Sequence, residues 1–305
     1  MQGTAGATLG QNRDLGVSDE AFARHRRLLF TVAYEMLGSA SDAEDVVQET
    51  WLRWADVDLA SVRDPRAYLV RIVTRQALNR LRTLARRRED YVGEWLPEPL
   101  ITSPDVAADV ELAESLSMAM LTVLETLGPS ERAVFVLREV FDTPYDEIAE
   151  AVGKSAAAVR QIAHRAREHV AARRPRVSVT ATEQKEALDR FLAAIRHGDL
   201  QGLLDVLAPD VVVVADGGGV VPAARRPIQG AERVASLLIR GLRSVDFEAA
   251  AVWLNGSPAI RIDARTAFNA AVSVAVEDGR ITRIYVVANP QKLARLDGIT
   301  PLTRS

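Results

Sequence analysis

The 305-residue sequence contains no cysteine, which excludes disulfide bonds, thiolate metal sites and catalysis by a thiol. Long apolar runs are also missing, because no stretch approaches the roughly 20 apolar residues that a membrane-spanning helix requires. Lysine is scarce, since only Lys154, Lys185 and Lys292 occur and arginine supplies the other basic residues. Residues 1–17 lack the apolar segment of a secretory signal and are predicted to form a disordered tail. We therefore expect a cytoplasmic protein that has no membrane partner, no metal and no other cofactor.

The charged residues are segregated along the chain, although the net charge is only −3. Residues 66–88 hold eight arginines and no acid, residues 89–131 hold ten acids and no lysine or arginine, and residues 154–176 hold seven basic residues and one acid. The order basic, acidic, basic indicates an organised pattern. Three solvated surfaces are the alternative interpretation.

The spacing of apolar residues predicts a multidomain protein with two all-α domains followed by an α+β domain. Helices are expected over residues 19–38, 41–54 and 65–86, with a capping box at Ser41 and Glu44 and a cap at Asp64-Pro65. Further helices are expected over 109–127, 129–140, 144–152 and 155–173, and then over 183–197, 199–207 and 230–243. β-Branched stretches predict strands at 211–214, 247–254, 259–262, 268–276 and 280–287, in a curved antiparallel sheet. The expected boundaries are a tail at 1–17, domains at 18–88, 109–175 and 183–298, linkers at 89–108 and 176–182, and a second tail at 299–305.

Residues 144–167 predict a helix-turn-helix. Ala149 supplies the small residue where the helices cross, Gly153 tolerates the positive φ of the turn, and Val159 anchors the second helix. Ile162 and Ala166 are expected to face the core with Val159. The outer face of the second helix is expected to bind DNA, because arginine and glutamine suit bidentate reading of bases and further arginines neutralise phosphate. The expected DNA-binding residues are Arg160, Gln161, His164, Arg165 and Arg167. A helical hairpin with a basic outer face is the alternative.

Two segments lie in the order and at the spacing of a known family. The stretch Asp-Ala-Glu-Asp-Val-Val-Gln-Glu-Thr-Trp-Leu-Arg at residues 42–53, with Pro65–Val73, resembles region 2 of extracytoplasmic-function (ECF) sigma factors. Residues Thr143–Arg167 resemble region 4 of the same family, and the resemblance covers about residues 20–175. It implies a subunit that directs RNA polymerase core to promoters by recognising −10 and −35 elements.

The resemblance also implies roles for particular residues. The helix-turn-helix would bind the −35 element, and the loop Leu59–Asp64 would hold a base flipped from the −10 element. The expected −10 residues are Arg71, Arg75, Gln76, Asn79 and Arg82. The largest polymerase subunit would bind region 2 through its coiled coil, with the flap of the second-largest subunit as another contact. The expected polymerase-binding residues are Asp42, Glu44, Asp45, Gln48, Glu49 and Arg53. The acidic linker would either thread a basic polymerase channel or serve as a plain spacer.

The region after residue 182 resembles SnoaL-like domains of the NTF2-like cone fold. Three motifs, Trp95–Pro99, Asp216–Gly219 and Asn289–Leu293, resemble those of sigma factors with such an extension, among them the mycobacterial sigma J group. In that group the extension is thought to regulate the sigma domains in cis. Because Trp95 and Leu96 are costly to expose, we expect the linker to dock on the C-terminal domain. Docking could inhibit or favour promoter use. The expected interdomain contacts are Trp95, Leu96, Pro97, Asp216, Gly217, Gly218, Asn289, Pro290 and Lys292; ordinary turns are the alternative for the last two motifs.

Two other hypotheses remain for the chain. A cone fold encloses a pocket, so an unidentified small ligand could bind the C-terminal domain. Catalysis would need a shielded acid or base, and Asp216 and Asp263 are the best carboxylates, whereas His197 lies at a helix end; we expect no enzyme. A ligand-sensing helix-turn-helix regulator that does not bind polymerase would share the DNA-binding helices, but it would not explain residues 42–53.

Overall fold

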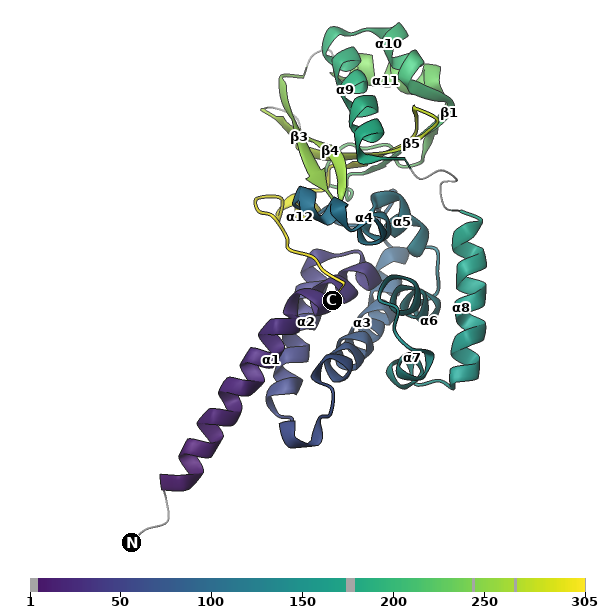
Figure 1. Cartoon of the computed structure of the whole chain (residues 1–305). Helices are drawn as coiled ribbons and strands as arrows, with labels where there is room; N and C mark the ends of the chain where they lie inside the picture. Colours follow the sequence, from purple (N-terminus) through teal and green to yellow (C-terminus); the bar gives the residue numbers. More distant parts are fainter. Residues whose placement is uncertain (1–4, 174–178, 243–244, 266–267, 305) are drawn as a thin grey trace. The chain divides into compact units, whose positions relative to one another are not determined.

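The computed structural model describes residues 5–173, 179–242, 245–265 and 268–304, with the side chains of 5–18 and 85–89 left aside. It contains two compact units (Figure 1). Unit 1 comprises Met1–Ala85, Leu127–His169 and Leu302–Ser305, and unit 2 comprises Arg86–Thr126 and Val170–Pro301. Among the described residues, no helix combines the length and apolar character needed to cross a membrane.

The first part of unit 1 consists of α1 (Ala5–Leu37), α2 (Ala40–Ala55), the 3-10 turn η1 (Leu59–Ser61) and α3 (Pro65–Glu89). Helix α1 begins at Ala5 and thus includes residues 5–17, where we expected a tail; this stretch has no proline to stop a helix. Helix α2 is capped by Ser39, whose Oγ accepts the N–H of Asp42, so the predicted cap at Ser41 is wrong by two residues. Trp54 is buried among these helices, whereas Trp51 of the same helix is 39% exposed.

The second part of unit 1 contains α6 (Pro129–Phe135), which continues as a five-residue π-helix at Val136–Val140, then α7 (Tyr145–Val152) and α8 (Ala156–Ala171). Gly153 has φ +69° between α7 and α8, as the predicted turn requires. Ser155 caps α8 by accepting the N–H of Ala158 at 3.2 Å. Val159, Ile162 and Ala166 are buried, so the predicted inner face of α8 is confirmed.

Unit 2 begins with the segment that connects the two helical parts of unit 1. After α3 the chain has no helix until the 3-10 turn η2 (Pro104–Ala108), which is followed by α4 (Val110–Leu116) and α5 (Met118–Leu124). The single helix predicted over 109–127 is therefore two helices. Ser117 divides them, because its Oγ caps α5 by accepting the Met120 N–H. These helices belong to the same compact unit as the C-terminal domain, which differs from the predicted domain at 109–175.

The C-terminal domain combines α-helices with one mixed sheet. The helices are α9 (Ala181–His197), α10 (Leu200–Val206) and α11 (Ala231–Leu242), and the short α12 (Pro290–Leu293) follows the last strand. The strands are β1 (Leu207–Asp216), β2 (Ile228–Gln229), β3 (Phe247–Leu254), β4 (Ser257–Ala264), β5 (Ala270–Glu277) and β6 (Arg280–Val287), in the order β2-β1-β6-β5-β4-β3. Because β1 and β6 pair in parallel, the prediction of an antiparallel sheet is wrong. This pairing joins distant segments, so local pattern gives no sign of it.

The two faces of the sheet carry different cores. One face packs against α9, α10 and α11 (Figure 1), and its buried residues include Phe191, Val213 and Val272. The opposite face packs against the segment 90–126, with Leu96 and Met118 among the buried residues. Side chains alternate along a strand. The segment 90–126 thus covers apolar residues on this face of the C-terminal sheet.

Candidate promoter-binding surfaces and linker latch

The exposed face of α8 carries all five residues predicted to bind the −35 element, namely Arg160, Gln161, His164, Arg165 and Arg167. Two of them contact α7 or the π-helix before it. Arg160 lies over the Tyr145 ring at 5.6 Å, and Arg167 pairs with Glu139 at 3.1 Å. His164 lies 3.5 Å from Glu168, one turn further along α8. The helix thus presents a solvent-facing surface of arginine and polar side chains, which suits a major groove.

The residues predicted to bind the −10 element lie on α3, but they do not share one surface. Arg75, Asn79 and Arg82 are exposed, and Arg82 donates to the Asn79 side chain at 3.2 Å. Gln76 is only 8% exposed and donates to Glu49 of α2 at 3.1 Å. The structure therefore does not bring Gln76 to the surface that the other residues form. Helical spacing explains this, because a residue one position from Arg75 points about 100° away from it.

Glu150, an exposed residue near the end of α7, accepts hydrogen bonds from two of the arginines predicted to bind the −10 element. Its carboxylate accepts from Arg71 at 2.8 Å, and its backbone carbonyl accepts from Arg75 at 2.7 Å. Both arginines belong to region-2-like α3, whereas Glu150 belongs to the helix-turn-helix. A carboxylate oxygen thus pairs with Arg71 and a backbone carbonyl oxygen with Arg75, and both arginines are predicted to bind the −10 element.

A buried contact joins α6 to α1 in the same unit. Arg132 is 1% exposed, and its Nε donates to the backbone carbonyl of Glu35 at 3.1 Å. Burial lowers the pKa of the Arg132 guanidinium, and the nearby Glu35 carboxylate opposes that shift. The contact fixes the start of the helix-turn-helix part against the first helical part, and nothing in the sequence signalled it.

The residues predicted to bind polymerase lie on α2, and four of the six make contacts within unit 1. Arg80 bridges Asp42 at 2.7 Å and Asp45 at 2.5 Å, and Arg26 pairs with Glu44 at 2.6 Å. Glu49 accepts from Gln76, as described above. Gln48 and Arg53 are exposed. Two apolar residues beside them, Trp51 and Leu52, are 39% and 55% exposed and add an apolar patch that the sequence analysis missed.

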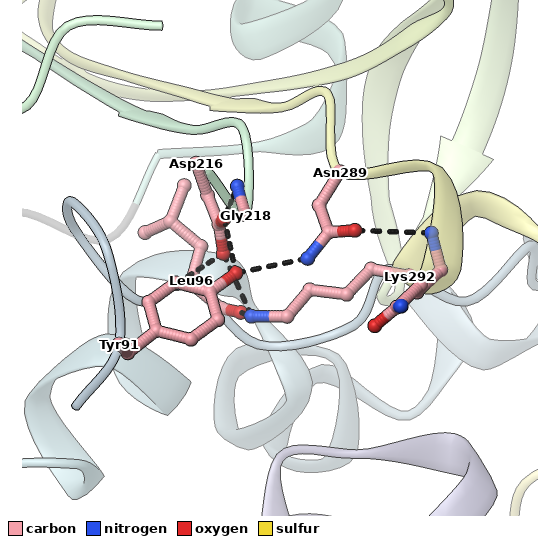
Figure 2. Close-up of polar contacts among 7 residues, drawn as sticks. Tyr91, Leu96, Asp216, Gly218, Asn289 and Lys292 are labelled. Atoms are coloured by element: carbon pink, nitrogen blue, oxygen red, sulfur yellow. Dashed lines mark hydrogen bonds and ion pairs between the residues drawn. The ribbon is translucent and has the colours of Figure 1, made fainter. Parts of the chain in front are cut away.

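Asp216, at the end of β1, is fully buried and its carboxylate receives four donors (Figure 2). One oxygen accepts from the Tyr91 hydroxyl at 2.6 Å and from the Gly218 N–H at 3.0 Å. The other accepts from the Leu96 N–H at 2.9 Å and lies 2.7 Å from Lys292 Nζ. The linker therefore docks through a satisfied buried carboxylate. We call Tyr91, Trp95, Leu96, Asp216, Asn289 and Lys292 the linker latch.

Lys292, on α12, completes the latch from the other side. Its side chain is 4% exposed, and its ammonium also donates to the Leu96 carbonyl and lies 3.1 Å from the centre of the Trp95 ring. The aromatic face attracts the cation, and the attraction is strongest where water is excluded. Tyr91 packs edge-on against Trp95 with 4.9 Å between ring centres. The aromatic side chains of the linker thus surround the charge that the C-terminal domain provides.

Asn289 connects the Tyr91 hydroxyl to α12. Its Nδ2 donates to that hydroxyl at 2.9 Å, and its Oδ1 caps α12 by accepting the Gln291 N–H at 3.0 Å. Pro290 then occupies the first helical position. Burial raises the pKa of the Tyr91 hydroxyl above its ordinary value, and the hydrogen bond to Asp216 adds to the shift. Tyr91 therefore stays a neutral donor over the physiological pH range, and the sequence analysis did not identify it.

The glycines after Asp216 are required by close packing. A Cβ on Gly217 would lie 2.2 Å from the carbonyl oxygen of Val221, and one on Gly218 would lie 2.3 Å from Nδ2 of Asn289. Gly218 also has φ +63°, which L side chains rarely adopt. The predicted contact residues Leu96, Asp216, Gly218, Asn289 and Lys292 are thus brought together, with Pro97 buried beside them.

A second docking contact lies at β3, the edge strand of the sheet. Leu100 and Asn255 exchange two hydrogen bonds, from the Leu100 N–H to Oδ1 at 3.0 Å and from the Asn255 N–H to the Leu100 carbonyl at 2.9 Å. The Thr102 N–H donates to the Trp253 carbonyl at 3.0 Å, and its Oγ1 accepts the Gly256 N–H at 3.0 Å. The linker thus pairs with an exposed strand edge. Asn-Gly is a hairpin signal that could have located this turn.

The carboxylates considered for catalysis lie in different settings. Asp216 belongs to the linker latch, where the Lys292 ammonium and three other donors engage it. Asp263 pairs with Arg261 at 3.0 Å and has a side chain that is 43% exposed. His197 contacts the Ala193 carbonyl at 2.8 Å in the last turn of α9. The structure therefore brings none of these three groups to another.

Comparisons with known proteins cover nearly the whole chain. Models of Sigma-70 region 2 and Sigma-70 region 4 match residues 21–87 and 117–170. The chain is 37% identical over 289 residues to the ECF RNA polymerase sigma factor SigJ of Mycobacterium tuberculosis, covering 89% of this chain and 91% of the relative. The crystal structure of M. tuberculosis SigJ matches with 32% identity and a TM-score of 0.74, covering 92% of this chain and 99% of that chain. An NTF2-like protein from Burkholderia xenovorans matches over 38% of this chain and 97% of its own, with 21% identity and a TM-score of 0.30.

The two family models and the SigJ structure confirm the predicted fold class of two helical sigma-type domains followed by an α+β domain. Several site residues were missed. Tyr91, Thr102 and Asn255 hold the linker, and Glu150 holds arginines of α3. Their hydrogen-bond partners are 75 to 198 residues away in sequence, so local patterns do not reveal them.

Proposed function

The chain belongs to the ECF family of RNA polymerase sigma factors, and from this premise we propose that docking of its linker on the C-terminal domain holds the promoter-binding surfaces in a closed state. As a member of that family it binds RNA polymerase core and recognises promoter DNA through its region 2 and region 4 domains. A ligand-sensing regulator that does not bind polymerase is not favoured, because it accounts for only one of the two sigma regions.

Recognition of the −35 element is assigned to α8. Arg160, Gln161 and Arg165 are exposed near the first half of the helix, the part that enters the major groove in helix-turn-helix proteins. His164 and Arg167 flank them and supply phosphate contacts. The exposure of this whole face, together with its buried opposite face, supports the assignment.

Recognition of the −10 element is assigned to Arg71, Arg75, Asn79 and Arg82 of α3. Gln76 supports this helix through its bond to Glu49 rather than by touching DNA. In the closed state Glu150 occupies Arg71 and Arg75. DNA must displace Glu150 to reach both arginines, so the helix-turn-helix restrains the −10 surface until the two helical parts separate.

Polymerase binding is assigned to the exposed side of α2. Gln48 and Arg53 offer polar contacts, Trp51 and Leu52 offer apolar area, and the acidic residues add charge complementary to a basic partner. The coiled coil of the largest subunit is the proposed partner for this helix, and the flap of the second-largest subunit is the proposed partner for region 4.

The linker latch is the observation that carries the regulatory proposal. The segment between regions 2 and 4 is held at two contacts, the latch and the edge of β3. A linker that is bound along its length cannot extend, and regions 2 and 4 must reach two separate promoter elements. Release of the linker therefore precedes promoter engagement, and the C-terminal domain acts in cis as an inhibitor.

A domain that regulates by holding the linker needs no catalytic residues, and we propose that the C-terminal domain is not an enzyme. Asp216 is committed to the latch and Asp263 to an exposed ion pair, so neither is positioned as a shielded acid or base. Because its partners are polymerase and promoter DNA, the proposed location of the protein is the cytoplasm.

The test is transcription in vitro with core polymerase and a promoter selected by the wild-type protein. Asp216→Asn removes the charge that the linker latch needs, and Asp210→Asn is the matched control on an exposed part of the same strand. We expect D216N to increase the output per bound polymerase and D210N to leave it unchanged. Equal or lower output from D216N, with the C-terminal domain still folded by circular dichroism, would contradict cis inhibition.

A further inference from the structure

A cavity of about 360 Å³ lies in unit 2 where the linker helices meet the C-terminal domain. One wall comes from η2, α4 and α5, and the other comes from the start of α9, the β3–β4 turn and β5. We propose that this cavity binds a compact, uncharged lipophile carrying one hydroxyl or carbonyl group, and that the ligand stabilises the docked linker. The first part rests on the cavity and the second on the docked linker, and only an effect of the ligand on transcription would rest on the proposed cis inhibition.

The size and lining of the cavity indicate an apolar ligand. Ligand pockets usually measure about 300–1,000 Å³, so this cavity suits a small molecule at the lower end of that range. Met118 and Met120 of α5 line it, and these are two of the four methionines in the chain. Methionine is flexible and polarizable, which lets a pocket adapt to a ligand of irregular shape. Leu254 and Ala275 supply the apolar wall on the sheet side.

Charge in the lining decides which ligands are excluded. Glu114 is the only charged residue among the lining residues that the structure describes, and they include no lysine or arginine. An anionic ligand would therefore lose its hydration next to the Glu114 carboxylate, with no lysine or arginine among these lining residues. A neutral ligand avoids this cost.

Two polar side chains are placed to orient a neutral ligand. Ser273 lies on β5 between Ala271 and Ala275, which pack toward the linker, so its hydroxyl faces the same side of the sheet. Gln184 of α9 donates its amide to the Val274 carbonyl at 3.0 Å, which holds this polar side chain in the lining of the cavity. A hydroxyl or carbonyl on the ligand can bond to one of these groups, and the methionines can cover the rest.

The walls of the cavity explain why binding would act on the linker. Ala107 belongs to the linker, and Met118 and Met120 belong to α5 at the start of the region 4 match, whereas Gln184 and Ser273 belong to the C-terminal domain. Undocking the linker separates the walls, so the ligand binds the docked state only. A ligand at a hundredfold excess over its dissociation constant would lower the undocked population about a hundredfold. The cavity thus couples a small-molecule signal to the linker latch.

The direct test uses 2-naphthol as a neutral probe and 2-naphthoate as an anion of nearly the same shape, titrated by fluorescence into the full-length protein. Ala107→Phe fills the cavity, and Ala108→Phe is the matched control on an exposed position of the same 3-10 turn. We expect saturable binding of 2-naphthol, at least tenfold weaker in A107F and unchanged in A108F. Equal binding to A107F and wild type, or no saturable binding, would overturn the site.

A charge reversal in the lining tests the exclusion of anionic ligands. Glu114→Arg should allow 2-naphthoate to bind at least tenfold more tightly than to wild type, whereas Glu111→Arg, exposed on the same helix and outside the lining, should not. Wild-type binding of 2-naphthoate as tight as that of 2-naphthol would overturn the ligand class.

Hydrogen exchange separates the site from its coupling to the linker. Saturating 2-naphthol should slow exchange of the amides of Leu96, Leu100 and Thr102, which donate to the C-terminal domain. Unchanged exchange with bound probe would overturn the coupling. If D216N leaves transcription unaltered while 2-naphthol still slows exchange at these amides, cis inhibition fails and the coupled site stands.

Discussion

Two ion pairs restrain this sigma factor, and they differ in their contact with water. In unit 1, Arg71 and Glu150 meet with side chains that are 33% and 65% exposed. In unit 2, Lys292 and Asp216 meet with side chains that are 4% and 0% exposed. An exposed pair contributes about 0–1 kcal/mol and is screened by salt, whereas removal of one partner from a buried pair costs about 3–5 kcal/mol. The buried pair is therefore suited to hold a state, and the exposed pair to yield to DNA.

The largest expected effect comes from breaking the buried pair. Lys292→Met leaves the Asp216 carboxylate buried without its cation, and we expect unit 2 to lose about 3–5 kcal/mol of unfolding free energy. Lys185→Met, which removes an exposed lysine paired with Asp189, is the matched control and should cost no more than a surface substitution. Urea denaturation of both variants measures the difference; equal midpoints for the two would show that Lys292 does not hold the linker.

Backbone geometry provides the next test of the buried latch. Gly218→Ala places a methyl group 2.3 Å from the Asn289 side chain at a residue with φ +63°. We expect a loss of about 1–3 kcal/mol in unfolding free energy, because the strained conformation and the displaced Asn289 both disfavour the docked state. Gly279→Ala, which also has positive φ but has open space around it, serves as the control for strain alone. Similar losses in both variants would argue against close packing at the latch.

In unit 1, the comparison predicts that freely exposed arginines matter more for DNA than those already paired. Arg160→Ala and Arg165→Ala on α8 should each weaken −35 binding by about 1–3 kcal/mol. Fluorescence anisotropy with a −35 duplex provides the measurement. Unchanged affinity in both variants would mean that another face of α8 reads the DNA.

The pH dependence of the linker latch gives a smaller effect with a definite sign. Because the pKa of Tyr91 is raised in the folded protein, the folded state binds more protons than the unfolded state above the ordinary tyrosine value of about 10. The stabilisation by Tyr91 is therefore complete below pH 10 and is lost as pH rises further. Tyr91→Phe should reduce this decline by an amount on the order of 1 kcal/mol. Thermal unfolding of both proteins between pH 8 and 11 tests this, and parallel curves would contradict it.

The smallest effect is expected at the exposed pair. Glu150→Gln weakens the carboxylate contact with Arg71, and we expect it to improve binding of single-stranded −10 DNA by less than about 1 kcal/mol, most clearly at low salt. Glu147→Gln, on the exposed side of the same helix, is the control. A larger gain, or one that persists at high salt, would show that Glu150 acts as a buried rather than an exposed contact.

The residues that were predicted correctly carry local signals. Gly153 and Ser155 mark the turn of the helix-turn-helix, and Trp95 and Leu96 stand out as apolar residues in a polar linker. The parallel pairing of β1 with β6 and the role of Tyr91 depend on contacts between distant segments, which periodicity cannot reveal. Gln76 was predicted to bind DNA because it lies in the arginine-rich stretch that matches the family's −10 region. Its position in the helical register instead turns it toward α2, where it is buried and bonds to Glu49.

Hydrogen exchange at the Leu96 amide tests the central claim most directly, because this N–H donates to Asp216 only while the linker is docked. The account predicts strong protection in the free protein and its loss in the complex with core polymerase and promoter DNA. Protection that persists in an initiating complex would contradict the account, because the linker would then remain docked while both promoter elements are bound.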